Sequence, residues 1–418
     1  MKLTRRHLGL LAAGLLGLGM AGSAQAADPI KIGYGMSLTG GLAVNGKAAL
    51  LAQQIWKDDI NAKGGILGRP VELVYYDDQS NPAVVPGIYQ KLLSVDKVDI
   101  IIGGYGTVPI AAAMPVVMQN NKFFIGVLGL AVNSEFNYPR YFVMIPSGPD
   151  PKPAFTKGFF DTAMAQTPKP ESVAIVAADI EFSKNAADGA RENAKKSGLK
   201  IVYDKSYPAN TTDFTPIVRA IQATNPDLVL VASYPPDSVG MIRAANEIGL
   251  KTKMFGGGMV GLQSTAIKLQ LGPLLNGIVN YDFWLPAPKM MNPEMAAFLK
   301  KYQDKAKDAG VDLLGYYLPP YAYAQMQVVA QAVEATKGFD DAKLADYVRA
   351  NSFKTVVGDV RFGKGGEWAE PKVLQVQYQG ITAANDIEQF RDTKHQVILT
   401  PSEYATGKVV YPYTDGRK

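Results

Sequence analysis

Apolar and polar positions repeat along this chain with two alternating periods. Short apolar runs, typical of buried strands, alternate with stretches in which apolar residues recur every three or four positions, as on one face of a helix. In the first unit the predicted strands cover 30–37, 71–76, 99–102 and 123–127. The predicted helices between them cover 46–61, 81–93 and 108–119. Because strand and helix alternate, we expect an α/β fold with a parallel sheet and helices on both faces.

The same alternation restarts after a proline-rich stretch at 146–153, which suits a crossover between two units. The second set of predicted strands covers 173–177, 201–204, 228–232 and 254–255, the last ending before three glycines. Three further helices are predicted at 294–308, 316–335 and 341–351. Too few strands follow Tyr281 for a third domain, so these helices should complete the first two. Ligands bind beyond the carboxyl ends of parallel strands, so two such sheets predict a hinged cleft between them.

The N-terminus has the pattern of an export signal. A basic head with Lys2, Arg5 and Arg6 precedes an uncharged apolar run at 8–22, which is short for a membrane span. Residues 24–26 have the small-x-small form of a cleavage site, so we expect residues 1–26 to be removed. An uncleaved anchor and a twin-arginine export route are the alternatives. The mature chain should therefore work outside the cytoplasm.

Composition excludes several classes of protein. The chain has no Cys, which excludes disulfides and a lipid-anchored form. The signal takes His7 with it, so His395 alone remains and a His-based metal site or Ser-His-Asp triad is not expected. Removing three basic head residues from 43 leaves 40 against 38 acidic ones, a charge of +2. Without a basic tract, nucleic acid is not an expected partner, and no cofactor or metal is expected.

Several motifs carry a family resemblance. The segment 60–70 reads Ile-Asn-Ala-Lys-Gly-Gly-Ile-Leu-Gly-Arg-Pro and is followed by Tyr-Asp-Asp at 76–78. Together with Ser-Leu-Thr-Gly at 37–40 and Gly-Leu-Lys-Thr at 249–252, it resembles periplasmic solute-binding proteins of the leucine/isoleucine/valine type. These are receptors of ABC importers. The similarity runs from about residue 30 to residue 378.

The resemblance implies a type I periplasmic binding fold, with two doubly wound parallel-sheet lobes joined by three crossovers. We place the crossovers near Ile145, Asp282 and Glu370. Lobe 1 would then comprise 27–145 plus 283–370, and lobe 2 would comprise 146–282 plus 371–418. The tail from residue 385 extends beyond the usual end of the family and has no assigned role. The family further implies a periplasmic, monomeric receptor without enzymatic activity that delivers its ligand to a membrane permease.

In family members a hydroxyl residue at the start of the helix after the third strand binds the ligand carboxylate. The matching segment contains Tyr105, Gly106 and Thr107, with Thr107 as the expected N-cap. Free N–H groups and the helix dipole favour an anion there. A role for Thr107 in capping alone is the alternative, and both roles can coexist. The next strand ends at Leu128, Gly129 and Leu130, where amino-acid binders carry a threonine in place of Leu130.

The second lobe departs from the amino-acid receptors. Those relatives pair the ligand ammonium with an acidic residue, where this chain has Gly258, followed by Met259. A buried ammonium without a counter-charge costs several kcal/mol, so the site favours an anion with an apolar body. Aromatic residues at the other matching positions are expected to line the cleft, and packing within a lobe is the alternative for each. The remaining candidate residues are Asn45, Phe182, Tyr234, Tyr316, Phe283 and Trp284.

The leading prediction is a receptor for a small carboxylate, either aromatic or otherwise apolar. A branched-chain amino acid is the first alternative, with Asp179, Glu181 or Asp237 as its counter-charge. A short amide is a second alternative ligand. A sensory binding protein, which signals to a membrane partner, is the alternative to a transport receptor. An enzyme is least favoured, because Thr39 stands where a nucleophile elbow around Ser37 requires Gly.

Overall fold

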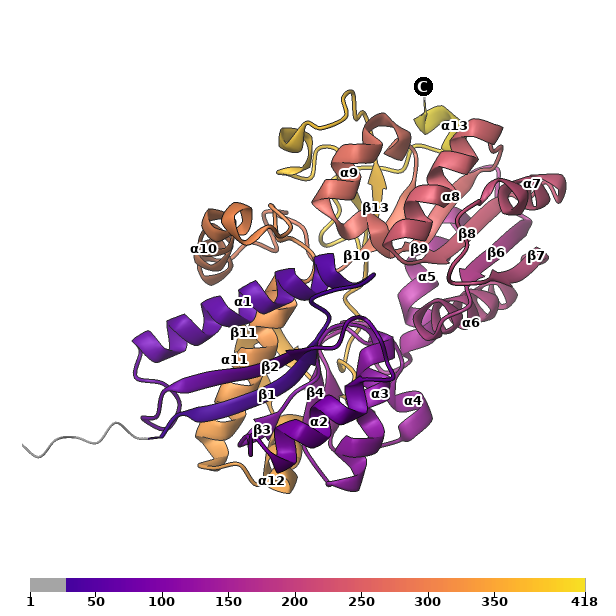
Figure 1. Cartoon of the computed structure of the whole chain (residues 1–418). Coiled ribbons are helices and arrows are strands. Elements are labelled where there is room, and N and C mark those ends of the chain that lie inside the picture. Colours follow the sequence, from indigo (N-terminus) through magenta and orange to yellow (C-terminus); the bar gives the residue numbers. More distant parts are fainter. Residues whose placement is uncertain (1–27, 418) are drawn as a thin grey trace, which may run out of the picture.

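The computed structural model describes residues 28–417, so the predicted signal at 1–26 lies outside the described residues. Two α/β parts lie side by side and are joined by extended segments (Figure 1). Across residues 28–417 no helix is both long and apolar enough to cross a membrane.

The first part is built on a small parallel sheet with the strand order β2-β1-β3, and β4 and β5 form a further parallel pair. A hydrogen bond of 2.9 Å from the Gly103 N–H to the Ile125 carbonyl connects the two sets of strands. We call this the three-stranded part. Its strands are β1 (Ile30–Met36), β2 (Val71–Asp77), β3 (Ile100–Ile101), β4 (Phe124–Gly126) and β5 (Tyr141–Val143).

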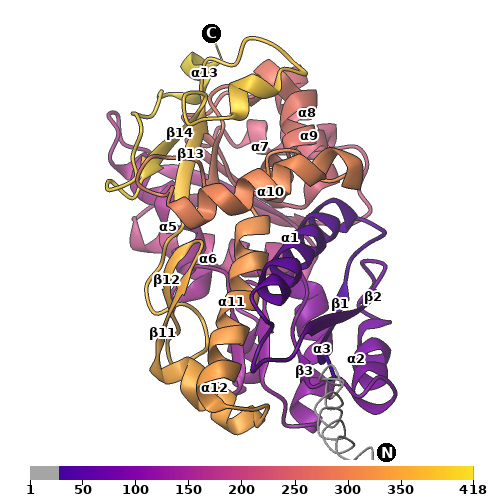
Figure 2. The same cartoon turned by 90° about the vertical axis from the view of Figure 1, so that its left-hand side faces the viewer.

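Helices from both ends of the chain cover this part. Helix α11 packs along α1, and α10 lies against α1 as well (Figure 2). The early helices are α1 (Ala43–Ala62), α2 (Val85–Ser94), α3 (Thr107–Gln119) and α4 (Asn133–Phe136). The late helices are α10 (Pro293–Ala309), α11 (Pro319–Thr336) and α12 (Asp341–Ala350). The prediction that the late helices complete the earlier units is therefore confirmed for this part.

The second part contains a seven-stranded sheet in the order β14-β13-β10-β9-β8-β6-β7. We call it the seven-stranded part. Its parallel strands are β6 (Ser172–Ala178), β7 (Lys200–Tyr207), β8 (Leu228–Ser233), β9 (Met254–Met259) and β10 (Val279–Asp282). Its helical segments are α5 (Pro151–Met164), α6 (Glu181–Lys196), α7 (Thr215–Ala223), α8 (Pro235–Ile248), η1 (Val260–Gln263), α9 (Thr265–Leu271) and η2 (Gly272–Leu275).

The C-terminal segment adds strands that the hydrophobic pattern did not predict. Strands β13 (Leu374–Tyr378) and β14 (Gln396–Thr400) extend the seven-stranded sheet beyond β10, and both pair antiparallel. A separate hairpin is formed by β11 (Ser352–Thr355) and β12 (Gly358–Arg361). The tail also contains η3 (Ile387–Phe390) and α13 (Tyr413–Gly416). The expectation of wholly parallel sheets is corrected, because the tail returns along the sheet edge.

The sequence predicted that strand β9 would end before the three glycines. That prediction is wrong, because β9 runs through them. The reason is the close approach of its neighbours. Gly256 has φ of 137°, and a Cβ there would lie 1.8 Å from the Val279 carbonyl oxygen of β10. Only glycine allows β9 and β10 to pair at this distance.

The chain passes between the two parts in three segments, which lie between β5 and α5, between β10 and α10, and between β12 and β13. This connectivity agrees with a type I periplasmic binding fold. The residues at which the lobes divide, placed from sequence near Ile145, Asp282 and Glu370, remain a proposal.

Candidate ligand-binding site

A small cavity of about 20 Å³ lies where the loops after the parallel strands of both parts meet. Loops after β3 and β4 approach it from the three-stranded part, and loops after β6, β8 and β9 approach it from the seven-stranded part. Its lining comprises Tyr105, Gly106, Thr107, Leu128, Leu130, Ile145, Phe155, Phe182, Tyr234, Val260, Tyr281, Phe283 and Tyr317. This is the position expected for a ligand site at the carboxyl ends of parallel strands.

The N-terminus of α3 forms one wall of the cavity. The helix begins at Thr107, and Gly106 is the N-cap with φ of 98°, a left-handed conformation that favours glycine. The Gly106 N–H donates to the Leu128 carbonyl. The N–H groups of Thr107 and Val108 lie in the first turn, where a helix supplies no acceptor of its own. These two donors and the helix dipole favour an anion beside α3.

The Thr107 side chain contacts the neighbouring loop and does not cap its own helix. Its Oγ1 accepts a hydrogen bond of 3.0 Å from the Leu130 N–H, and the residue is 2 % exposed. The prediction that Thr107 is an N-cap is therefore wrong, because Gly106 occupies that position without a side-chain bond. Because Oγ1 is the acceptor in the bond from Leu130, the Thr107 hydroxyl proton remains for a ligand oxygen.

The glycines before Tyr105 serve packing between strands. A Cβ at Gly104 would lie 2.1 Å from the Gly35 carbonyl oxygen, and a Cβ at Gly103 would lie 2.9 Å from the Gly126 Cα. These two positions are therefore explained by the approach of the chain to β1 and β4. Of the three glycines in the segment, Gly106 is the one that lines the cavity.

Aromatic rings form a continuous wall through the cavity. Neighbouring ring centroids are 5.4 Å apart for Tyr234 and Phe182, 5.6 Å for Phe182 and Phe155, and 4.6 Å for Phe155 and Tyr281. The series continues from Tyr281 to Phe283 at 5.2 Å and from Phe283 to Tyr317 at 5.6 Å, the last pair stacked. Such surfaces suit a flat apolar ligand body.

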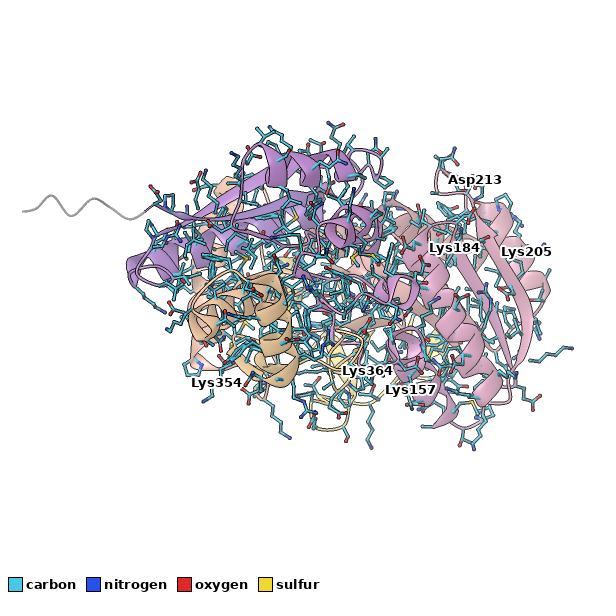
Figure 3. The ribbon with its side chains drawn as sticks, turned by 90° about the horizontal axis from the view of Figure 1, so that it is seen from below. Lys157, Lys184, Lys205, Asp213, Lys354 and Lys364 are labelled. Carbon is cyan, nitrogen blue, oxygen red and sulfur yellow. The ribbon has the colours of Figure 1, made fainter. Side chains whose placement is uncertain are left out.

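No charged side chain belongs to the cavity lining described above. Charged residues such as those labelled in Figure 3 are exposed at the periphery, among them Lys157, Lys184, Lys205, Asp213, Lys354 and Lys364. Burial raises the pKa of Tyr105 to about 12, so its phenol keeps its proton at neutral pH. The cavity therefore offers neutral hydroxyl donors and apolar rings.

The three carboxylates considered as counter-charges differ in their surroundings. Asp179 is exposed and pairs with Lys184 at 2.6 Å, whereas the buried Asp237 accepts a bond from the Tyr207 hydroxyl at 3.2 Å. Burial and then the Glu135 carboxylate raise the pKa of Glu181 to about 7. Its buried Oε1 has no hydrogen-bond partner among residues 28–417. Glu181 precedes the cavity residue Phe182 in the chain. Burial, then the Tyr105 phenol and then the Glu181 carboxylate raise the pKa of the cavity residue Tyr234.

Seven of the residues predicted from sequence lie in the cavity lining: Tyr105, Gly106, Thr107, Leu128, Leu130, Phe182 and Tyr234. Phe283, a further sequence candidate, also lines it, whereas Trp284 does not. Asn45 lies behind the lining and donates from Nδ2 to the Tyr105 hydroxyl at 2.6 Å. Gly129 also lies outside the lining, and a Cβ there would contact Ile110 and Tyr141.

The other predicted residues outside the lining are Gly258, Met259 and Tyr316. Gly258 lies within the longer β9 and Met259 ends it. Both pair with β8, so the position expected for an amino-acid receptor's acid is part of the sheet. Tyr316 donates to the Arg391 carbonyl at 3.0 Å, and its ring packs on Trp284. Helix α11 begins at Pro319, so the Tyr316 position had no helical phase from which its direction could be inferred.

Sequence reasoning missed several lining residues. Tyr317 lines the cavity, whereas the sequence placed the preceding residue, Tyr316, there. Ile145, Phe155 and Tyr281 lie in or beside the segments that cross between the parts, where periodicity carries no information on direction. Val260 follows the unexpectedly long β9.

Two α/β parts around a cavity at their strand ends are typical of hinged ligand-binding proteins. The chain belongs to the periplasmic binding protein family, whose model matches residues 29–380. The Leu/Ile/Val-binding protein homolog 8 of Brucella suis is 27 % identical over 385 residues, covering 88 % of this chain and 94 % of the relative. Homolog 7 of Brucella abortus is 28 % identical over 376 residues, covering 86 % and 91 %. The predicted resemblance is confirmed, and the chain is a binding receptor and not an enzyme.

Solved structures share the fold at low sequence identity. The substrate-binding protein LivJ of Streptococcus pneumoniae, in complex with isoleucine, has a TM-score of 0.72 at 19 % identity, covering 90 % of this chain and all of its own. A solute-binding protein of an ABC transporter from R. palustris, in complex with 4-hydroxybenzoate, has a TM-score of 0.70 at 22 % identity, covering 84 % and 94 %. Another solute-binding protein, from Rhodopseudomonas palustris in complex with 3,4-dihydroxybenzoic acid, has a TM-score of 0.72 at 17 % identity. The match covers 92 % of this chain and 99 % of that protein. The type I periplasmic binding fold is thus confirmed.

Proposed function

We propose that this protein is the periplasmic receptor of an ABC importer and binds a small aromatic or otherwise apolar carboxylate between its two parts. The observation that carries the proposal is the character of the cavity. Its lining has aromatic rings, the Thr107 hydroxyl and the start of α3, and it has no charged side chain. A carboxylate gains hydrogen bonds at α3, and an apolar body gains contact with the rings.

Binding would be coupled to closure because the cavity is lined from both sides. Two hydrogen bonds already connect these sides in the structure. Asn185 Nδ2 of α6 donates to the Leu130 carbonyl at 3.0 Å, and the hydroxyls of Tyr281 and Tyr317 are 3.2 Å apart. A ligand that contacts both parts only when they are close together shifts the population toward the closed form. The closed form would then deliver the acid to the membrane permease.

A branched-chain amino acid remains a second candidate because of Glu181. Its buried Oε1 lacks a hydrogen-bond partner among the described residues. Its charge also contributes, after burial and the Tyr105 phenol, to the raised pKa of Tyr234. An ammonium group near Tyr234 would satisfy this carboxylate. The names of the Brucella relatives point in the same direction.

A thermal-shift panel of benzoate, 4-hydroxybenzoate, cinnamate, hexanoate, their primary amides and leucine tests the proposal. A ligand at about one hundred times its dissociation constant adds about 2.7 kcal/mol to the free energy of unfolding, which gives a clear rise in melting temperature. We expect at least one acid to raise it and leucine to have no effect.

Stabilisation by leucine alone would contradict the carboxylate proposal and favour the second candidate. The variant Glu181→Gln then separates the two further. It should abolish leucine binding if Glu181 holds the ammonium, and it should preserve acid binding if the ligand is an anion.

A further inference from the structure

The polar groups of the cavity can be counted as donors and acceptors. The Tyr105 hydroxyl oxygen accepts the bond of 2.6 Å from Asn45 Nδ2, and an amide nitrogen cannot accept the phenol proton in return. The hydroxyls of Tyr281 and Tyr317 share one hydrogen bond of 3.2 Å. The three phenols of Tyr105, Tyr281 and Tyr317 therefore have three protons and one hydrogen bond among themselves. Two phenol protons need acceptors outside this set.

Backbone acceptors around the cavity are already engaged. The Leu128 carbonyl accepts from the Gly106 N–H, and the Leu130 carbonyl accepts from Asn185. The Phe283 carbonyl accepts from the Tyr321 hydroxyl at 2.8 Å. With the Thr107 proton also available, the cavity has several donor groups that make no hydrogen bond of their own among residues 28–417. A buried donor without a partner is costly, so a bound ligand should supply acceptor oxygens here.

We propose that Asn45, Tyr105, Tyr281 and Tyr317 form a donor array that determines specificity, with Tyr105 donating to an oxygen of the ligand acid and Asn45 acting as the positioning residue. The inference rests on the proposed carboxylate function and deepens it. The array selects ligands whose polar end only accepts hydrogen bonds, and it discriminates against the primary amide of the same acid. An amide NH₂ would face phenol protons without an acceptor.

The test compares the acid that gives the largest thermal shift in the panel with the primary amide of that acid, by calorimetric titration. The variant Tyr105→Phe removes the proton and keeps the ring. Loss of one hydrogen bond to a charged group should weaken binding of the acid about 10- to 100-fold. Binding of the amide should change about threefold or less, because an amide loses no charge-assisted bond. The matched control Tyr323→Phe removes a phenol that bonds Asp59 outside the cavity, and should leave both affinities unchanged.

A double-mutant cycle tests the role of Asn45. In Asn45→Asp the new carboxylate accepts the Tyr105 proton, so this variant should also lose affinity for the acid. If Asn45→Asp acts through the Tyr105 proton, it should weaken acid binding much less in the Tyr105→Phe background than in the unmodified protein. Simple charge repulsion would instead give additive losses of affinity. Equal melting temperatures without ligand would exclude misfolding as the cause.

Three results overturn the inference. These are a twofold or smaller effect of Tyr105→Phe on the acid, equal losses for acid and amide, or an additive cycle. Each of them leaves the carboxylate proposal standing, since the acid would still bind. If no acid binds the unmodified protein, the proposed function itself fails, and the donor array fails with it.

Discussion

At the scale of single residues, the proposed site is built from hydroxyls and aromatic rings. The Thr107 oxygen accepts a hydrogen bond from the Leu130 N–H, and Asn45 donates to the Tyr105 hydroxyl from behind the cavity lining. The family motif indicated the neighbourhood of Thr107. It did not reveal that Gly106 would be the cap, because the left-handed φ of Gly106 depends on the loop around it.

Glu181 should make stability depend on pH. Its pKa in the folded protein, about 7, lies above the ordinary value of a glutamate. The folded state therefore binds the proton more tightly, and stability falls as pH rises from the ordinary value through 7. Glu181→Gln should raise the free energy of unfolding by about 1 kcal/mol at pH 8, a value discounted from the full pKa shift because the side chain is only partly buried.

At pH 4 the same variant should have almost no effect, since Glu181 is then protonated in the folded state and mostly protonated in the unfolded state. Denaturant unfolding at the two pH values measures the difference. Asp179→Asn, at an exposed carboxylate two residues away, is the control. Equal effects of Glu181→Gln at both pH values would contradict the assignment.

At the scale of elements, α11 holds the site loop in place from the far side of the sheet. The Gln325 side chain is fully buried and donates from Nε2 to the carbonyls of Gly103 and Ile125 at 2.8 and 2.7 Å. It also accepts from Gln53 of α1 at 2.9 Å. A late helix thus ties the ends of β3 and β4 together just before Tyr105. The sequence predicted this helix by its periodicity, but not that a glutamine on it would complete the sheet.

Gln325→Met should destabilise the protein by about 3 kcal/mol, because it leaves the Gly103 carbonyl and the Gln53 amide without partners in a buried setting and leaves the Ile125 carbonyl only its bond from the Gly103 N–H. Urea unfolding followed by circular dichroism measures this. Gln331→Met on the same helix removes only part-buried or exposed bonds to the carbonyls of Gln327 and Lys354, and should cost less than 1 kcal/mol. A comparable loss of unfolding free energy in both variants would show that the buried hydrogen bonds of Gln325 stabilise the protein no more than the exposed ones of Gln331.

At the scale of the whole molecule, the C-terminal tail completes the region where β10 leads out of its sheet. Gln396 of β14 donates to Asp282 Oδ2 at 2.9 Å and accepts from Lys268 Nζ at 3.1 Å. Burial raises the pKa of Asp282 to about 7, and Lys268 partly opposes this shift. The tail, drawn yellow in Figure 1, thereby joins α9 to the end of β10, the second crossover. This gives the tail the structural role that the sequence did not.

Gln396→Leu should lower the free energy of unfolding by about 2 kcal/mol, since two buried charged groups each lose a hydrogen-bond partner. Thermal and urea unfolding measure the change. Gln90→Leu, at an exposed side chain of α2, should stay within about 0.5 kcal/mol. If Gln396→Leu behaved like this control, the tail would be peripheral to stability.

The sequence by itself determined the alternation of strands and helices, the family, and the loops after β3, β4, β6 and β8 that supply seven lining residues. Those features follow from local periodicity and from motifs in which neighbouring residues act together. Tertiary structure alone decided that β13 would pair antiparallel with β10 and β14 antiparallel with β13, and that Tyr317 rather than Tyr316 would line the cavity. It also decided which hydroxyls keep a free proton. These outcomes depend on contacts between residues far apart in the chain, and no local pattern encodes the direction in which a loop side chain then points.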